Sequence, residues 1–185
     1  MKNIWVLSDN IDIVGMLNEV ESQPHWWLFT TKRQENIPVQ RYTQSIPLVS
    51  SFCENNTIRA IDSHFYKKTG IWNQFPIITS WLQKTFPAGL SWISIIKLLP
   101  EKEVYEHFDY GAYYRVRTRF HLVLKGRYSY TVGDETIIAK AGTLFCFNNS
   151  LIHSAHNLEN EDRIAVIFDV EHAFFGLGLT IINDG

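Results

Sequence analysis

The segment RVRTRFHLVL, residues 115–124, decides the fold, because charged and apolar side chains alternate along it. Successive side chains of a β-strand point to opposite faces, so this alternation predicts a strand with one polar and one apolar face. The polar face carries Arg115, Arg117, Arg119 and His121, and the apolar face carries Val116, Phe120, Leu122 and Leu124. We expect the apolar face to pack against helices, while the polar face lies either in solvent or in a functional site.

Short β-rich runs separated by turns surround this segment. They occupy residues 90–99, 127–132, 135–140, 143–147 and 163–170. Turn-like dipeptides mark the breaks, at Lys125-Gly126, Gly133-Asp134 and Ala141-Gly142. Closely spaced strands with glycine turns are typical of a small antiparallel barrel or jelly roll. We therefore predict a mainly β fold with flanking helices.

Two N-terminal segments have the apolar periodicity of helices. In SDNIDIVGMLNEVES, residues 8–22, one face carries Ile13, Leu17 and Val20, and the N-cap is expected at Ser8, Asp9 or Asn10. In FPIITSWLQKTF, residues 75–86, one face carries Ile78, Trp81 and Leu82. Residues 1–185 are therefore interpreted as one domain, in which a partly helical part, about residues 1–89, packs on a β-barrel core, about residues 90–172.

Composition limits the function classes. The 185 residues are 45% hydrophobic, which is enough for one sizeable core. With 17 basic against 19 acidic residues, the net charge of -2 gives no field that would hold a nucleic acid. Cys53 and Cys146 form no CxxC pattern, and the N-terminus has no secretory signal, so we expect a cytoplasmic protein. No window approaches the roughly 20 apolar residues that span a membrane.

A possible metal site follows from three residues. His107 and Asp109 lie two positions apart in HFDYG, and His153 follows much later in SLIHSAHN. Two neutral imidazoles and one carboxylate form the facial triad of non-haem iron(II), which leaves positions open for a bidentate co-substrate and for oxygen. The alternative is an exposed polar pair at a strand end. His156, three positions after His153, is expected to face the other way in an extended segment.

Arg163 lies ten positions after His153, at the head of an alternating strand. A guanidinium pairs with a carboxylate in fork geometry, so Arg163 suits the far carboxylate of a dicarboxylic keto acid whose other end chelates the metal. The alternation places Ala165 and Ile167 beside Arg163, and it places Ile164, Val166 and Phe168 on the opposite face.

Four segments, taken in order, resemble one family. They are HFDYG, RVRTRFHLVLKG, AGTLFCFNNSLIHSAHN and DRIAVIFDV. The ordered set resembles the aspartyl/asparaginyl β-hydroxylases, a family of iron(II)- and 2-oxoglutarate-dependent oxygenases that also contains hydroxylases of free proline and of lipid A acyl chains. The resemblance covers about residues 90–172 and implies a double-stranded β-helix, the cupin-like form of the jelly roll.

The resemblance also implies roles for individual residues. His107 and His153 would bind iron(II), Arg163 would hold the distal carboxylate of 2-oxoglutarate, and His121 and Arg119 would contact this co-substrate. Animal aspartyl hydroxylases lack the carboxylate ligand, whereas this sequence has Asp109 there, as the family's proline hydroxylases do. A full triad argues against halogenation, which needs that position empty.

The expected reaction is hydroxylation of an unactivated C–H by molecular oxygen, with decarboxylation of 2-oxoglutarate to succinate. The family points to an amino acid or an amino-acid-derived substrate, free, carrier-bound or peptidyl. Arg117 is a candidate substrate contact on the polar face. Arg41 is another, in residues 32–51, which form either a lid or wall of the substrate site or an ordinary edge strand.

Two other classes of function remain open. AGTLFCFNNSLIH resembles the second cupin motif, so a cupin-like metal-binding protein with a reaction independent of 2-oxoglutarate, or with a ligand-binding role, is the alternative. The HxH of the first cupin motif is missing, and Arg163 would have no role. A catalytically inactive binding module is the third reading. The oligomeric state is not determined by the sequence, and AFFGLGLTII, residues 173–182, is either a late strand or a packing surface.

Overall fold

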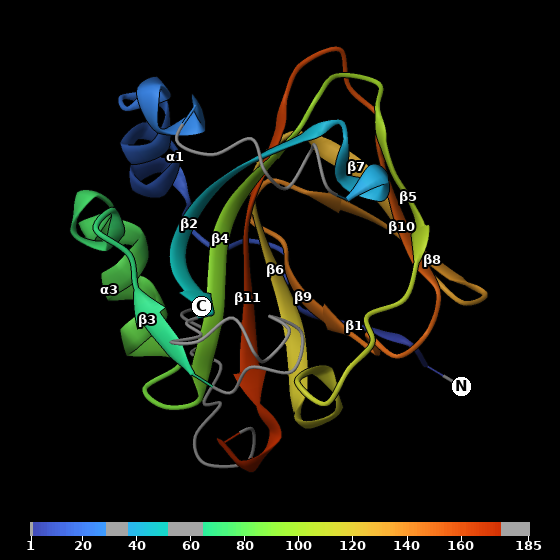
Figure 1. Cartoon of the computed structure of the whole chain (residues 1–185). Helices are drawn as coiled ribbons and strands as arrows, with labels where there is room; N and C mark the ends of the chain where they lie inside the picture. The colour runs from blue at the N-terminus through green and yellow to red at the C-terminus, as the bar shows by residue number, and fades with distance from the viewer. Residues whose placement is uncertain (1, 29–36, 52–64, 175–185) are drawn as a thin grey trace.

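The computed structural model describes residues 2–28, 37–51 and 65–174. Its strands form a seven-stranded and a four-stranded sheet, and every pair of neighbouring strands is antiparallel. Figure 1 shows the two sheets facing each other. This arrangement is the double-stranded β-helix that the sequence predicted.

The larger sheet has, in spatial order, β1 (Ile4–Ser8), β9 (Leu144–Phe147), β6 (Arg117–Lys125), β11 (Arg163–Glu171), β4 (Leu90–Leu98), β2 (Thr43–Ser51) and β3 (Tyr66–Lys68). The smaller sheet has β5 (Glu103–His107), β10 (His153–Asn157), β7 (Arg127–Val132) and β8 (Glu135–Lys140). The segment that opened the sequence analysis is thus β6, near the centre of the larger sheet. Its neighbours are β9, a short apolar strand of four residues, and β11, a strand of nine residues that is mainly apolar.

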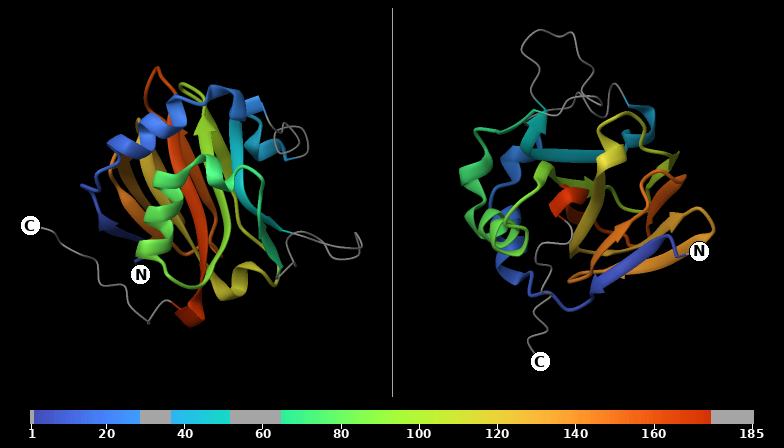
Figure 2. Two further views of the ribbon diagram at one scale, coloured as in Figure 1. Left: turned by 90° about the vertical axis from the view of Figure 1, so that its left-hand side faces the viewer. Right: turned by 90° about the horizontal axis from the view of Figure 1, so that it is seen from below.

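Two α-helices, α1 (Val14–Glu21) and α3 (Pro76–Thr85), cover the outer face of the larger sheet (Figure 2). Short 3-10 helices connect other elements: η1 (Pro24–Leu28), η2 (Pro38–Gln40), η4 (Trp72–Gln74), η5 (Tyr114–Val116) and η6 (His172–Phe174). Helix α1 begins later than predicted, because Ser8 still belongs to β1. The predicted N-caps are therefore wrong. The Oδ1 atom of Asp12 instead accepts a hydrogen bond from the N–H of Val14 at 3.1 Å.

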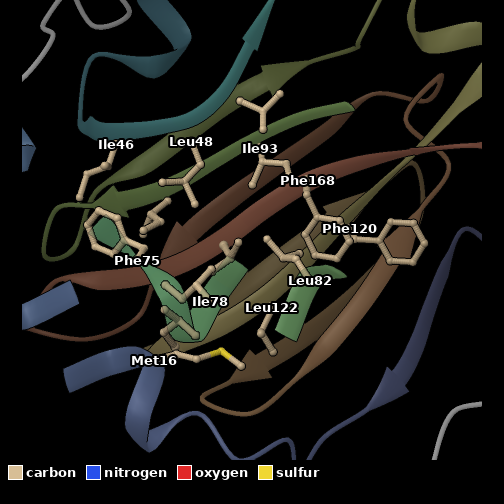
Figure 3. Close-up of a cluster of buried hydrophobic side chains, with 14 of the residues drawn as sticks. Met16, Ile46, Leu48, Phe75, Ile78, Leu82, Ile93, Phe120, Leu122 and Phe168 are labelled. Carbon is tan, nitrogen blue, oxygen red and sulfur yellow. The ribbon is translucent and has the colours of Figure 1, made fainter. Parts of the chain in front are cut away.

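The main core lies between these helices and the larger sheet (Figure 3). Met16 of α1 and Ile78 and Leu82 of α3 meet buried side chains of the sheet, including Ile46, Leu48, Ile93, Phe120, Leu122 and Phe168. Phe120 and Phe168 are stacked, with ring centroids 5.2 Å apart. The apolar face of β6 therefore packs as predicted, except that Val116 lies before the strand in η5 and is 45% exposed.

A second core lies between the two sheets. Its buried members include Val123, Tyr128, Tyr130, Phe145, Phe147 and Ala155. The turn between β6 and β7 closes this side at Gly126, whose φ is +82°. A Cβ atom at Gly126 would lie 3.2 Å from the Cα atom of Arg163, so glycine is required here both for the turn and for the close approach of β11.

The predicted division of the chain needs a correction. The first 89 residues contribute β1, β2 and β3 to the larger sheet in addition to helices. Strand β2 lies between β4 and β3, so this part of residues 32–51 is an interior strand and not an edge strand. Proline has no N–H to donate to a neighbouring strand, and the pairing of β2 with β4 shifts register between Pro47 and Val49, an irregularity that accommodates the proline.

Several predictions concern residues outside the described ranges. Cys53, residues 32–36 of the predicted lid and residues 175–182 of the C-terminal apolar run lie there. Residues 173 and 174 of that run belong to η6. Within the described part of the chain, no helix is long and apolar enough to cross a membrane.

Candidate metal centre

Three possible metal ligands meet at one end of the smaller sheet. His107 is the last residue of β5, and its direct cross-strand partner is His153, the first residue of β10. Asp109 follows β5 by two residues, and its N–H donates to the carbonyl oxygen of Asn149 at 3.2 Å. Each of the three side chains offers one ligand atom, and these atoms lie within 4.8 Å of one another. His153 is thus the first residue of a strand.

Both imidazoles are held by backbone carbonyl groups. The Nδ1 atom of His107 lies 2.7 Å from the oxygen of Tyr105, and the Nδ1 atom of His153 lies 2.9 Å from the oxygen of Leu151. Each Nδ1 therefore carries the donated proton, and each Nε2 has a free lone pair for a metal ion. Burial lowers the pKa of His153 to about 4, although Asp109 acts in the opposite direction. His153 is thus neutral, as a ligand must be.

The carboxylate of Asp109 belongs to a buried ion network. Its Oδ2 atom accepts a hydrogen bond from Nη1 of Arg119 at 2.9 Å. Arg119 also forms a two-point ion pair with Asp169, in which Nε–Oδ1 is 2.8 Å and Nη2–Oδ2 is 2.9 Å. Asp169 is fully buried and accepts a further hydrogen bond from the hydroxyl of Tyr113 at 2.8 Å. Although burial opposes it, Asp109 and Asp169 hold the pKa of Arg119 well above its ordinary value.

Arg163 lies in the same pocket without an anionic partner among the described residues. Its Cζ atom lies 3.9 Å from the ring centroid of Tyr128, and its Nη2 atom lies 3.5 Å from Nδ1 of His121. Its Nε atom is buried and has no hydrogen-bond partner in the described part of the chain. A buried guanidinium without an anionic partner is costly, so this arrangement favours an anion that binds there.

His121 contacts both Arg163 and Tyr128. Its Nδ1 atom is 3.1 Å from the hydroxyl of Tyr128 and also faces the guanidinium of Arg163, so Nδ1 accepts hydrogen bonds and Nε2 carries the proton. Burial, and then the positive charge of Arg163, lowers the pKa of His121 well below its ordinary value. His121 is therefore a neutral hydrogen-bond donor.

These polar groups and a set of apolar side chains line one pocket. Its lining includes His107, His153, Arg119, His121 and Arg163, together with Trp92, Ile96, Val104, Tyr130 and Ile167. Ala165 and Ile167 lie in the small cluster of buried residues next to Arg163, while Ile164, Val166 and Phe168 face the helices, as the alternation of β11 predicted. Gln40, at the end of η2, also lines the pocket.

Sequence comparison identifies the family. The family model described as aspartyl/asparaginyl β-hydroxylase matches residues 22–173. The chain belongs to this family. No curated protein matches the chain significantly.

The solved structures that are similar to this aspartyl/asparaginyl β-hydroxylase family member have low sequence identity to it. The cupin domain of Cnp3 from Schizosaccharomyces pombe is 13% identical, with a TM-score of 0.39 over 44% of this chain and 56% of that one. A predicted oxalate decarboxylase from Thermotoga maritima is 17% identical, with a TM-score of 0.39 over 48% and 73%. An uncharacterized protein with a double-stranded β-helix domain from Klebsiella pneumoniae is 19% identical, with a TM-score of 0.38 over 47% and 72%. No functional conclusion rests on these similarities.

Two arginines expected to contact substrate lie elsewhere in this family member. Arg117 is 2% exposed and donates to Oγ of Ser91 and to the carbonyl oxygen of Tyr113, both at 3.1 Å, and to Glu171. Arg41 is exposed, and its guanidinium lies 5.0 Å from the ring centroid of Tyr105. Neither residue lines the pocket.

Three residues of the site and its surroundings were not predicted from the sequence: Asp169, Tyr113 and Gln40. Asp169 carried one signal, since it is the only ionisable residue between Arg163 and Val170 in an otherwise apolar strand. Its partner, however, depends on the pairing of β11 with β6, in which Asp169 lies opposite Arg119. Gln40 precedes β2 in a short helix and carried no signal.

Proposed function

We propose that the chain is an iron(II)- and 2-oxoglutarate-dependent hydroxylase that acts on an unactivated C–H of an amino acid or of an amino-acid-derived substrate. One observation carries this proposal. The possible ligands His107, Asp109 and His153 share a pocket with Arg163, whose buried Nε atom has no partner in the described part of the chain. A metal site and an anion site thus lie side by side, which is what a metal-chelating keto acid with a second carboxylate requires.

The three ligands fit iron(II). They supply two neutral imidazole nitrogens and one carboxylate oxygen, the donor set of non-haem iron oxygenases. The hydrogen bonds from Nδ1 of each histidine to a backbone carbonyl orient both Nε2 atoms before the metal binds. When bound, iron(II) and 2-oxoglutarate would supply the oxidising chemistry, which consumes molecular oxygen and releases succinate and carbon dioxide.

The residues around Arg163 fit 2-oxoglutarate. Arg163 would bind the distal carboxylate in fork geometry, and the Nε2–H of His121 would donate a hydrogen bond to the same co-substrate. Tyr128 supports both residues, because its hydroxyl bonds to His121 and its ring lies against the guanidinium. Arg119 also lines the pocket and remains a candidate contact.

The rest of the pocket would hold the substrate and exclude water. Trp92, Ile96 and Ile167 form an apolar wall beside the metal ligands, and such a wall suits the carbon chain of a substrate. Arg117 is paired with Glu171 away from this pocket, so we assign it no role in substrate binding.

The deciding experiment adds iron(II) and 2-oxoglutarate anaerobically to the metal-free protein and records the visible spectrum. Chelation of the keto acid by iron in the triad should give a weak charge-transfer band. We expect the band in the parent protein and its loss in His153→Ala and Arg163→Ala. His156→Ala is the matched control, because His156 lies on the same strand but is exposed. Arg163→Lys keeps the charge and loses the fork, so it should bind 2-oxoglutarate more weakly.

Failure of the co-substrate assignment and failure of the ligand assignment would give different results. A parent protein that binds iron but shows no band with 2-oxoglutarate would favour a cupin-like reaction without this co-substrate. Loss of the band in His156→Ala to the same degree as in His153→Ala would overturn the ligand assignment. Succinate formation in the presence of oxygen then separates an enzyme from a binding module.

A further inference from the structure

Asp109 is the least supported of the three possible ligands by backbone structure. His107 and His153 are paired residues of neighbouring strands, whereas Asp109 lies in the irregular segment after β5. Its backbone N–H donates a hydrogen bond to the carbonyl oxygen of Asn149, and this bond leaves its side chain free to rotate. The position of the carboxylate must therefore come from a side-chain contact.

Arg119 provides this contact from a rigid position. It lies on β6 at the centre of the larger sheet, directly opposite Asp169 of β11. Asp169 binds Nε and Nη2 of the guanidinium, which fixes the plane of the group and directs Nη1 to Asp109. The rings of Trp92 and Tyr114 lie 5.0 and 5.1 Å from the guanidinium carbon and restrict it further.

The two carboxylate oxygens of Asp109 have different surroundings. Oδ2 is bound by Arg119, so Oδ1 remains for a metal ion, which predicts binding through a single oxygen. The charges also matter. Asp169 neutralises Arg119, so the pair Arg119–Asp169 adds no net charge beside Asp109. The negative charge of the Asp109 carboxylate is therefore not cancelled at the metal site. An unpaired arginine at this position would instead compete with the metal for both oxygens of Asp109.

We propose that Arg119 is a positioning residue that holds Asp109 for the metal through one oxygen, and that Asp169 is the buried counter-ion that keeps Arg119 in this role. The proposal rests on the proposed metal site and adds a function for Asp169, which touches no metal ligand itself. Four of the five N–H groups of Arg119 have partners, at Asp169, Asp109 and Tyr114. The remaining one, on Nη1, is free to contact a co-substrate in the same pocket.

The test measures cobalt(II) binding to the metal-free protein, because the visible d–d bands of cobalt report both its affinity and its coordination geometry. Arg119→Gln should lower the affinity about 10- to 100-fold, the usual effect of losing an outer partner of a ligand. Asp169→Asn should also lower it and change the bands, although all three ligands and Arg119 remain. Tyr113→Phe, which keeps the Arg119–Asp169 pair, should have the smallest effect of the three.

Arg117→Gln is the matched control. Arg117 lies two positions before Arg119 on the same face of β6, is also buried, and pairs with Glu171 of β11, but it does not contact Asp109. Its cobalt affinity should equal that of the parent. Circular dichroism and the thermal midpoint establish that each variant is folded. Should Arg119→Gln not fold, Asp169→Asn and Arg119→Lys carry the same test.

A double-mutant cycle shows whether Arg119 acts through Asp109. In an Asp109→Ala background, where the two histidines remain, Arg119→Gln should no longer change the affinity. An unchanged effect in that background, parent-like binding by Arg119→Gln, or an equal loss in Arg117→Gln would each overturn the proposal. Parent-like cobalt binding by His153→Ala would instead overturn the metal site itself, so the two failures are separate.

Discussion

His107 and His153 are direct cross-strand partners, and the centroids of their rings lie 4.3 Å apart. His107 ends β5, which is an edge strand of the smaller sheet, while His153 begins the next strand, β10. A metal ion bound by both residues would therefore tie the edge strand to the rest of the sheet.

Metal binding should raise the thermal midpoint of the protein. A ligand that binds only the folded state at 100 times its dissociation constant stabilises that state by about 2.7 kcal/mol. Differential scanning calorimetry with and without cobalt(II) measures the shift. We expect it to disappear in His107→Ala and to persist in His156→Ala, and a full shift in His107→Ala would contradict the site.

Replacement of Arg163 by methionine should separate stability from function. The guanidinium is buried, and its Nε atom has no partner in the described part of the chain, so its removal costs no ion pair. We expect the free energy of unfolding of Arg163→Met to be equal to that of the parent or about 1 kcal/mol higher. Urea unfolding measures this value, and the stabilisation by 2-oxoglutarate should be lost in the same variant. A decrease of several kcal/mol would show that the contacts of Arg163 with Tyr128 and His121 outweigh the cost of burying its charge.

Lower pH should destabilise the metal-free protein. The folded pKa of His153 is about 4, below the 6.5 of an unfolded histidine, and the pKa of His121 is lowered as well. The unfolded state therefore takes up protons first, and stability present above pH 6.5 is lost as the pH falls toward 4. His153 alone would account for about 3 kcal/mol at pH 4.

Urea unfolding between pH 7 and pH 4.5 tests this dependence. His121→Asn should reduce the slope of the unfolding free energy with pH below 6.5, because one buried neutral histidine is removed. His156→Asn should keep the parent slope, since His156 is exposed. Equal slopes in the parent and in His121→Asn would be inconsistent with a low pKa for His121.

Gly126→Ala should weaken binding of 2-oxoglutarate as well as stability. The φ of Gly126 is +82°, and an added Cβ would lie 3.2 Å from Cα of Arg163, so the backbone of the anchoring arginine must shift. We expect a stability loss of about 1–2 kcal/mol from the left-handed backbone. Gly142→Ala is the matched control, because its φ is +86° and its added Cβ would meet Ile11 instead. It should lose similar stability and keep the parent affinity for 2-oxoglutarate, measured by titration calorimetry.

Phe120→Ala should destabilise the fold while leaving the metal ligands in place. Phe120 is fully buried, stacks on Phe168 and meets the edge of Phe86 at a centroid distance of 5.1 Å. Such truncations cost about 3–5 kcal/mol. Urea unfolding gives the loss. Because Phe120 points to the helices and away from the pocket, cobalt affinity of the folded variant should stay at the parent value.

The sequence predicted those features that depend on local alternation and spacing. The two faces of β6, the two faces of β11 and the order of histidine, aspartate, histidine and arginine all follow from residues close together in the chain or from the resemblance to the family. The sequence did not reveal β5 and β10, because EVYEH and HSAHN are short and polar. It offered the segment that contains β2 only as a possible edge strand, whereas β2 lies between β4 and β3.

Roles that depend on strand pairing could not be read from the sequence. Arg117 and Arg119 have equivalent positions in the alternation of β6, and only their neighbours on other strands distinguish them. Arg119 lies close to Asp109 and lines the pocket, whereas Arg117 contacts Glu171 and Ser91. The distinction between a residue near the site and a structural residue is therefore a property of the tertiary fold.

The two arginine–carboxylate pairs of β6 and β11 also specify how these strands align. Arg117 lies opposite Glu171, and Arg119 lies opposite Asp169. A slip of one residue would turn both arginines toward the apolar core beneath the helices. A slip of two residues would place Arg119 opposite Ile167, or leave Arg117 beyond the end of β11, and a buried charge would lose its partner in either case. The strands are long, apolar and otherwise permissive, so these two ion pairs select one alignment among several that hydrophobic burial alone would tolerate.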